Sequence, residues 1–509
     1  MEVELKLLLA PADVAAFRRL ALLQQFAVDK PHSQKLSSTY FDTPERRLKE
    51  HGMELRVRRA GRVWSETLKA DGRATAGLHQ RQEWDARVDG PQPDLAALAA
   101  LVGTGSEWEK VLTAPALAQG LEPIFDSVFR RTVWPLRLPH GALVELALDQ
   151  GELWQGDAHD PISEVELELK AGDPSALFDF ALKLQDKVPL RVGNFSKSAR
   201  GYALHALQPL SAVKAGSVEL AREMTVEQGF RAIVSNCMAQ MQDNESGVMG
   251  STDPESVHQM RVGMRRLRTA LRLFAKWMPF PEALQSELDW LAGELGAARD
   301  ADVLADSTLV RVSEACPMET ELLPLKRATS MIARAKRRRA AASVGSVRYS
   351  RLMLGLVAWL QGSRRDESLD DSARQALAAR IDKRAAKILA QRHKKLLESG
   401  KRLEDGSPEE RHRVRIAAKK ARYATEFFQC LHPAGRVKRY IKCLTALQDA
   451  LGWLHDAVVA DGLLRQIGKS HPELARSADF ARGFLHGRTS QDVRELAGPW
   501  TQFSAMKPP

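Results

Sequence analysis

The sequence predicts an α+β protein: a strand-rich amino-terminal part is followed by an all-helical carboxyl-terminal part with an internal duplication. Up to about residue 205, apolar and polar residues alternate with a period of two, which is typical of strands. From Val218 onward, apolar residues recur with the 3.6-residue period of amphipathic helices. A histidine- and arginine-rich motif also occurs twice in the helical part. Because 509 residues exceed one ordinary hydrophobic core, we expect at least two domains.

The strand-rich part, residues 1–205, is interrupted by three segments of helical periodicity. A proline opens each of them, and proline is a preferred residue at a helix start. The segments are Pro11–Leu23, Pro93–Leu101 and Pro174–Gln185. We therefore expect a sheet with a few short helices.

Residues 206–217 contain Pro, Gly and Ser without periodicity, which is the composition of a linker. The helical domain is expected over residues 218–509. Its duplication predicts two repeats, of about 218–365 and 366–509, that form paired helical bundles.

The two parts differ in charge. Residues 1–210 contain 26 Lys and Arg against 29 Asp and Glu, whereas the remainder contains 49 against 35, within a net charge of +11. The basic part is expected to bind a polyanion, which can be nucleic acid, anionic lipid or polyphosphate. No apolar run is long enough for a membrane helix, and the first residues lack the features of a secretory signal. We therefore expect a cytoplasmic protein with no membrane partner.

Five expected strands carry charged side chains at alternate positions, so the charges of each strand share one face. Acids predominate on some strands and bases on others. The alternative interpretation is an open sheet with an ordinary solvated outer face. The charged positions are Glu2, Glu4 and Lys6; Glu54, Arg56 and Arg58; Arg81, Glu83 and Asp85; Glu145 and Asp149; and Glu164, Glu166, Glu168 and Lys170.

A sheet that closes with these charges inside forms a tunnel lined by carboxylates and basic groups. Carboxylate oxygens bind hard divalent cations such as Mg²⁺ or Mn²⁺, and Arg and Lys bind phosphate oxygens. The lining thus predicts a divalent cofactor and a phosphate chain. We expect the empty tunnel to be less stable, because like charges in a partly desolvated site repel one another.

The order of these motifs resembles the CYTH family, also called triphosphate tunnel metalloenzymes. It begins with ExExK at Glu2, Glu4 and Lys6. It continues with ELRVR at 54–58, TLK at 67–69, RQE at 81–83, ALDQG at 147–151, EVELE at 164–168 and SKSARGY at 196–202. The helical part resembles the CHAD domain through His258, His412 and their basic surroundings. The order CYTH then CHAD is similar to bacterial inorganic triphosphatases.

The resemblance implies roles for the matching positions. Glu2 and Glu4, together with the strand that carries Glu164, Glu166 and Glu168, would hold a divalent metal. The triphosphate would be bound by Lys6, Arg56, Arg58, Lys69, Arg131 and Lys197. A second metal, or the orientation of water, would fall to Glu83, Glu145 and Asp149.

Two of these assignments stay open. Glu164, Glu166 and Glu168 point the same way on a strand, so the pattern does not rank them. Arg130 and Arg131 are adjacent, and a shift of one residue in register exchanges the side chain that faces inward.

The duplicated motif of the helical part places basic residues at i, i+3, i+7 and i+10, which is one stripe of a helix. The stripes are His258, Arg261, Arg265 and Arg268, and His412, Arg415, Lys419 and Arg422. The alternative is a solvated helix face. A polyanion would offset the repulsion within each stripe, whereas a metal site is disfavoured because no second His or carboxylate lies at i+3 or i+4.

Nucleic acid is the rival partner, with the basic runs at 334–339 and 392–395 as phosphate contacts. Aromatic residues make up only 6% of the chain and are not interleaved with these runs, so a phosphate chain without bases is favoured. The CHAD resemblance also implies polyphosphate binding.

The sequence as a whole predicts a metal-dependent inorganic triphosphatase that cleaves tripolyphosphate to pyrophosphate and phosphate, with its chemistry in the tunnel and polyphosphate on the helices. Three alternatives remain: a thiamine triphosphatase or an adenylate cyclase of the same fold, or a non-catalytic polyphosphate-binding scaffold. Every proposed catalytic residue precedes the linker, so residues 1–205 are expected to carry the activity.

Overall fold

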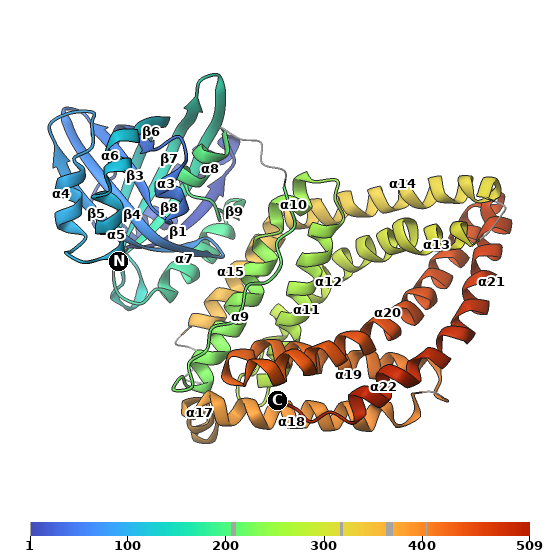
Figure 1. Cartoon of the computed structure of the whole chain (residues 1–509). Helices are drawn as coiled ribbons and strands as arrows, with labels where there is room; N and C mark the ends of the chain where they lie inside the picture. The colour runs from blue at the N-terminus through green and yellow to red at the C-terminus, as the bar shows by residue number, and fades with distance from the viewer. Residues whose placement is uncertain (1, 205–209, 316–318, 363–369, 404) are drawn as a thin grey trace. The chain divides into compact units, whose positions relative to one another are not determined.

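The computed structural model describes residues 2–204, 210–315, 319–362, 370–403 and 405–509 (Figure 1). These residues form two compact units. The barrel unit contains the described residues up to 204 together with 346–362, and the helical unit contains the described parts of 210–345 and 370–509.

The barrel unit is built on one antiparallel sheet in the strand order β5-β4-β3-β2-β6-β7-β8-β1-β9. Additional pairing of β1 with β5 closes strands β1–β8 into a barrel, and β9 pairs with the far end of β1. The strands are β1 (Glu2–Leu9), β2 (His32–Asp42), β3 (Glu54–Ala60), β4 (Val63–Thr75), β5 (Leu78–Val88), β6 (Glu122–Arg137), β7 (Leu143–Gln155), β8 (Ala158–Ala171) and β9 (Leu190–Val192). The closed barrel confirms the tunnel over the open sheet.

Part of the hydrophobic core of this unit lies outside the barrel. Leu55, Val57 and Leu68 project outward from β3 and β4 and pack with Leu98 and Leu112 of the helices that cover them. Because alternate residues of a strand point to opposite faces, an apolar exterior leaves the charged residues on the interior.

Short helices fill the connections, including the three places where the sequence indicates helical periodicity. They are α1 (Val14–Arg18), α2 (Ala21–Phe26), α3 (Arg47–Glu50), α4 (Leu95–Leu101), α5 (Glu107–Leu112), α6 (Pro115–Gly120), α7 (Ser175–Gln185) and α8 (Lys197–Leu204). One further helix of this unit, α15 (Val347–Gln361), comes from a distant part of the chain. The expected helical domain, 218–509, includes this segment, so its place in the barrel unit is a difference from the sequence expectation.

The helical unit contains helices only, apart from an isolated bridge between Thr225 and Arg380, among the residues described. Among the helices that pack against each other are α12 with α14 and α20 with α21 (Figure 1). The helices are α9 (Val226–Gln242), α10 (Glu245–Gly250), α11 (Glu255–Phe274), α12 (Glu282–Val303), α13 (Leu309–Glu314), α14 (Glu319–Val344), α17 (Asp371–Ala378), α18 (Ile381–Ser399), α19 (Pro408–Phe427), α20 (Ala434–Ser470), α21 (Ala475–Asp492) and α22 (Ala497–Ser504).

The duplication is visible in equivalent helices. The two basic motifs lie on α11 and α19, which both have 20 residues, and each of these packs against the next long helix, α12 or α20. The predicted fold class, an antiparallel barrel tunnel followed by a duplicated helical region, is confirmed.

The expected linker, 206–217, is described from residue 210 onward and has no helix or strand there. Its first residues, and the expected boundary between the repeats at 365 and 366, lie outside the described residues. Within the described chain, no helix combines the length and hydrophobicity that spanning a membrane requires.

Candidate functional site

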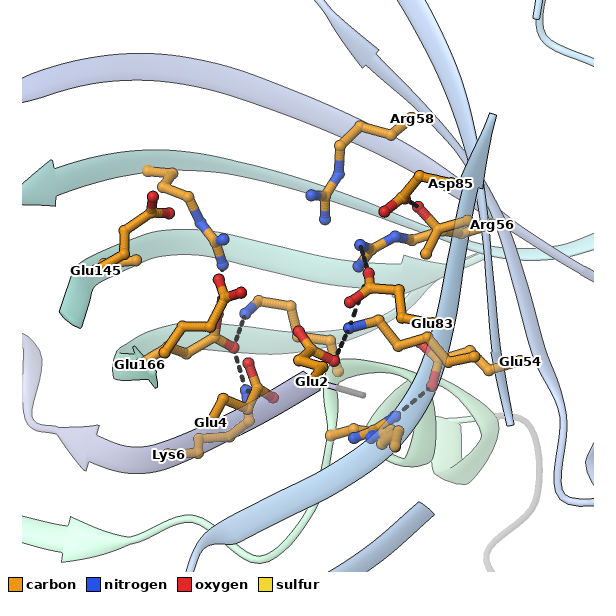
Figure 2. A pocket seen from close by; sticks show the side chains of 18 of the residues that line it. Glu2, Glu4, Lys6, Glu54, Arg56, Arg58, Glu83, Asp85, Glu145 and Glu166 are labelled. Atoms are coloured by element: carbon orange, nitrogen blue, oxygen red, sulfur yellow. Dashed lines mark hydrogen bonds and ion pairs between the residues drawn. The ribbon is translucent and has the colours of Figure 1, made fainter. Parts of the chain in front are cut away.

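The barrel encloses a cavity of about 260 Å³ whose lining is almost entirely ionic. Sixteen of the 21 lining residues are charged, eight acidic and eight basic. The strand register explains this: Lys6 of β1 lies opposite Glu166 of β8, and Glu4 lies opposite Glu168, so charged residues of neighbouring strands meet on the inner face. Figure 2 shows Glu4, Lys6 and Glu166 close together on one side of the cavity.

Twelve of the fourteen tunnel residues expected from the sequence line this cavity. They are Glu2, Glu4, Lys6, Arg56, Arg58, Lys69, Glu83, Arg131, Glu145, Glu166, Glu168 and Lys197. The other two, Asp149 and Glu164, lie behind the lining and are fully buried. The structure also separates the adjacent arginines, because Arg131 faces the cavity while Arg130 is exposed.

A buried cluster of three acids and three bases occupies one end of the cavity. The Nζ of Lys197 lies 2.6 Å from Asp149 Oδ2 and 2.9 Å from Glu166 Oε1, and it also contacts Glu164. Lys6 contacts the same two glutamates, and Arg131 contacts Asp149 and Glu166. Acids and bases here neutralise one another at close range.

In this cluster, burial and ion pairing shift the pKa values in opposite directions, and the effect of ion pairing is the larger one. Burial alone would lower the pKa of Lys6, but the carboxylates of Glu164 and Glu166 raise it well above its usual value. Burial alone would raise the pKa of Glu166, whereas Lys197, Lys6 and Arg131 lower it well below its usual value. Lys6 and Glu166 are therefore both charged at neutral pH.

A second ionic group lines the opposite wall. The Nζ of Lys69 lies 2.6 Å from Glu2 Oε2 and 3.3 Å from Glu83 Oε1, and Arg56 lies 3.8 Å from Glu83. Because most of the lining is paired, the repulsion that the sequence predicts for an empty tunnel is largely offset.

Arg58 is the exception in this lining. It has no ion-pair partner within the described part of the chain; its Nε donates to Ser38 Oγ at 3.1 Å, and its guanidinium group lies 5.7 Å from the Phe129 ring centre. Burial first, and then repulsion by Arg56 and Arg131, lowers the pKa of Arg58 to about 9. In Figure 2 it points into the cavity without a dashed contact. Arg58 is thus a cation available to an anionic ligand.

Four charged lining residues are additional to the predicted set: Glu54, Arg81, Asp85 and Lys170. Arg81 Nη1 lies 2.9 Å from Glu54 Oε2. All four belong to the alternating charged strands, so the parity of each strand is the signal that identifies them. Strand alternation does not identify Arg200, which lies on α8. Its ion-pair partners, Glu164 and Asp160, are on a strand that is distant in sequence.

The donor set of the cavity fits a hard divalent cation. Asp149, Glu164 and Glu166 are buried and can each offer one carboxylate oxygen, with these oxygens within 4.8 Å of one another. Glu2, Glu4 and Glu168 add further carboxylates on the cavity wall. An all-oxygen set is what Mg²⁺ and Mn²⁺ prefer.

The helical unit has a separate basic groove of about 1010 Å³, lined from α11, α12, α19 and α20. Eleven Lys and Arg line it against four Asp and Glu. All eight stripe residues from the two motifs line the groove: His258, Arg261, Arg265, Arg268, His412, Arg415, Lys419 and Arg422. The two stripes thus face one groove.

Equivalent residues of the two repeats form ion pairs in this groove. Arg261 lies 2.8 Å from Asp300, and the equivalent Arg415 lies 3.8 Å from Asp456. Arg299 and His455 also line the groove and were not among the predicted residues. They occupy matching positions in two similar segments of the repeats, LGAARD at 295–300 and LGWLHD at 451–456, and this similarity is the signal that could have found them.

The groove concentrates positive charge that is incompletely paired. The Nε groups of Arg265 and Arg415 are buried and have no hydrogen-bond partner among the described residues. Burial and the neighbouring Arg265 and Arg415 lower the pKa of Lys419 to about 7, and burial followed by Arg299 lowers the pKa of His258 to about 4. Such depression of basic pKa values indicates a site that an anion would relieve.

Both parts of the chain match known families. The CYTH domain model matches residues 1–202, and the CHAD domain model matches residues 232–465. An inorganic triphosphatase of Haemophilus influenzae is 32% identical over 211 residues, which cover 41% of this chain and 56% of that protein. An uncharacterized protein of Mycobacterium tuberculosis is 27% identical over 298 residues, covering 55% of this chain and 54% of that protein.

The chain thus spans about half the length of the curated relatives it matches. Among solved structures, the CHAD domain of the plant Ricinus communis is 38% identical, with a TM-score of 0.54; the match covers 59% of this chain and 98% of that one. Together with the charged barrel and the basic helical groove, these matches identify the chain as a CYTH domain followed by a CHAD domain.

Proposed function

We propose that the barrel unit is a metal-dependent inorganic triphosphatase that hydrolyses tripolyphosphate to pyrophosphate and phosphate. The observation that carries this proposal is a cavity lined by eight acids and eight bases, in which Arg58 has no ion-pair partner among the described residues. Similarity to an inorganic triphosphatase supports the reaction class.

The basic side chains would bind the phosphate chain. Arg58 is available at once, whereas Arg56 and Lys69 would exchange Glu83 and Glu2 for phosphate oxygens. Each exchange releases a carboxylate. The released acids would then face the cation that accompanies a triphosphate.

Glu2 and Glu4, together with Glu166 and Glu168, would hold that divalent cation. When bound, it would supply charge neutralisation of the phosphate oxygens and positioning of water, which are the main requirements of phosphoryl transfer. Asp149 is held by Arg131 and Lys197, so its role would be to orient these two cations. Glu83 and Glu145 remain candidates for orienting the attacking water.

The cavity is small, and the described residues that line it form no apolar compartment. Its uncharged lining residues are Tyr40, Ser65, Thr67, Ala147 and Ser196. A phosphate chain without an organic group fits such a lining better than thiamine triphosphate or ATP, because ring systems need apolar or stacking surfaces.

Phosphate release from tripolyphosphate, ATP, thiamine triphosphate and long polyphosphate, each with Mg²⁺, Mn²⁺ or EDTA, tests the proposal. We expect release from tripolyphosphate to be the fastest and EDTA to abolish it. Faster release from thiamine triphosphate would favour a thiamine triphosphatase instead, and cyclisation of ATP would favour an adenylate cyclase. Full activity in EDTA would overturn the metal requirement.

For the helical unit, we propose binding of long inorganic polyphosphate in the basic groove. The specific observation is the convergence of both stripes on one groove, with buried Nε groups of Arg265 and Arg415 that lack partners among the described residues. Phosphate oxygens would supply the missing acceptors.

A further inference from the structure

Helix α15 belongs to the barrel unit although the sequence places it between two helices of the helical unit. It packs against α7 and β9. Ser346 caps its first turn by accepting the Tyr349 amide at 3.2 Å, and the helix buries residues such as Ser350 and Leu354. A helix that is largely buried is part of a core.

Strand β9 has an edge that needs a partner. It is the last strand in the sheet order and pairs with β1 on one side only. On the other side, the amide of Val192 donates to the Oγ of Ser350 at 3.1 Å, and Ser350 is 4% exposed. An edge amide that is shielded from water and has no acceptor costs up to about 1–3 kcal/mol, so this contact of the part-buried Val192 amide anchors the strand to α15.

The residues that follow Val192 hold the backbone of Lys6. The amide of Gly193 donates to the Lys6 carbonyl at 3.0 Å, and the Lys6 amide donates to the Gly77 carbonyl at 2.8 Å. Gly77 in turn donates its amide to Asn194 Oδ1 at 3.0 Å. Lys6 is therefore clamped on both sides by groups tied to the β9 segment.

Close packing makes this clamp sensitive to movement. A Cβ at Gly193 would lie 3.0 Å from Lys6 Cγ, and a Cβ at Gly77, where φ is +77°, would lie 2.7 Å from the Lys6 carbonyl oxygen. A displacement of β9 would therefore be transmitted to Lys6, whose Nζ lies among the carboxylates of the cavity.

We propose that Ser350 is a positioning residue for the triphosphate reaction, which anchors β9 and through Gly193 sets the position of Lys6. This inference rests on the proposed function for its kinetic consequence, but not for the anchoring itself. It also means that residues 1–205, without α15, lack part of the framework that holds Lys6.

The test uses the full chain with Ser350→Ala, which removes the acceptor, and Ser350→Thr, which keeps it. Arg351→Ala is the matched control: the neighbouring side chain pairs with Asp186 at 2.7 Å, but both groups are about half exposed and contribute little. Ser350→Cys, similar in size with a weaker acceptor, serves as a second variant.

We expect Ser350→Ala to lower kcat/KM for tripolyphosphate about five- to tenfold, because small displacements of a binding group are costly. Ser350→Thr and Arg351→Ala should stay within about twofold of the parent, with Ser350→Cys between. Amide hydrogen exchange at Val192 and Gly193 should be at least about tenfold faster in Ser350→Ala.

A purely structural role would lower the melting temperature of Ser350→Ala and leave kcat/KM unchanged well below it, and that result would overturn the inference. If the parent fails to hydrolyse tripolyphosphate, the proposed function fails, but hydrogen exchange still decides the anchoring. Unchanged exchange at Val192 and Gly193 in Ser350→Ala would reject it in either case.

Discussion

Arg131 binds both carboxylate oxygens of Asp149, with Nε 2.8 Å from Oδ1 and Nη2 2.7 Å from Oδ2. This bidentate pair is the strongest geometry available to an arginine and a carboxylate. Arg58, in the same cavity, has no ion-pair partner among the described residues. The two arginines therefore have different roles: Arg131 is part of the framework, and Arg58 is available to a ligand.

This difference predicts the effect of Arg58→Gln. Removal of an unpaired, largely desolvated cation should leave the free energy of unfolding unchanged or raise it by up to about 2 kcal/mol. The KM for tripolyphosphate should rise at least about tenfold, because a charge-assisted phosphate contact is lost. Thermal unfolding and steady-state kinetics measure both effects. A clear fall in stability would contradict the assignment.

Arg131→Gln is the comparison variant for Arg58→Gln. It leaves Asp149 and Glu166 without one of their counter-charges, so the protein should lose about 3–5 kcal/mol of stability. Equal stability of the two variants would mean that the ion pairs of Arg131 do not contribute to the stability of the protein.

Glu4→Gln should abolish most of the hydrolysis. Glu4 is 8% exposed and lies on the cavity wall, where we propose that it holds the divalent cation. The rate should fall by at least about two orders of magnitude, because the amide is a poorer ligand than the carboxylate. Glu152→Gln, at an exposed position of β7, is the matched control and should keep the parent rate. A fully active Glu4→Gln would reject the site.

Polyphosphate binding to the groove should depend steeply on salt. Replacement of Arg261, Arg265, Arg415 and Lys419 by Ala should flatten the slope of log K against log salt by about three units, by analogy with counterion release from nucleic acids. Fluorescence-based titration with long polyphosphate at several salt concentrations measures this slope.

A matched quadruple variant removes four exposed basic residues elsewhere: Arg334, Arg338, Lys394 and Lys395. It should change the polyphosphate slope by less than about one unit. A larger effect of this variant, together with tighter binding of nucleic acid than of polyphosphate, would favour the rival partner.

The pH dependence of groove binding should be controlled by Lys419. From the sequence, His258 and His412 with ordinary pKa values predict tighter binding as pH falls from about 8 to 6. In the structure, burial and neighbouring cations lower the pKa of both histidines, to about 4 for His258, while the pKa of Lys419 lies at about 7. His258 is therefore neutral in the free groove across this range, and the lowered pKa of His412 reduces the positive charge that it carries there.

A bound polyanion would raise the pKa of Lys419, so the complex binds more protons than the free protein above pH 7. Affinity should therefore fall about tenfold for each pH unit between about 7 and 9. In the free protein, Arg261, Arg265 and Arg415 lower the pKa of Lys419, whereas Asp456 raises it. Calorimetry in two buffers at pH 8 should detect uptake of about one proton. Lys419→Arg should abolish it, and the exposed Lys395→Arg should not.

Glu66 should make the barrel unit less stable as pH rises. It is fully buried, its Oε2 accepts the Asp94 amide at 2.8 Å, and Oε1 has no partner within the described chain. Burial raises its pKa to about 7. Between pH 4.5 and 7 the folded state therefore holds a proton that the unfolded state has lost, and stability falls across this interval by about 1–3 kcal/mol.

Glu66→Gln keeps an acceptor for the Asp94 amide and removes the charge. It should be more stable than the parent at pH 8 and similar to it at pH 4.5, as measured by urea-dependent hydrogen exchange in β4. If Glu66→Gln and the parent differed in stability by the same amount at both pH values, ionisation of Glu66 would not be the cause of the difference.

The sequence alone determined the charged strands and the duplicated stripes. Strict alternation places Glu2, Glu4 and Lys6 on one face whatever the surrounding fold, because side chains of a strand alternate. Helical spacing in the same way places Arg261 and Arg265 on one stripe. Local periodicity sufficed for both.

Only the tertiary structure decided how these faces meet. The inward direction of Arg131, the unpaired state of Arg58 and the burial of Asp149 behind the lining depend on strand pairing between segments far apart in sequence. The same holds for α15, whose apolar periodicity would suit either unit. Periodicity tells which residues share a face, but burial, pairing and the resulting pKa shifts arise from what lies opposite that face, and this is a property of the closed fold.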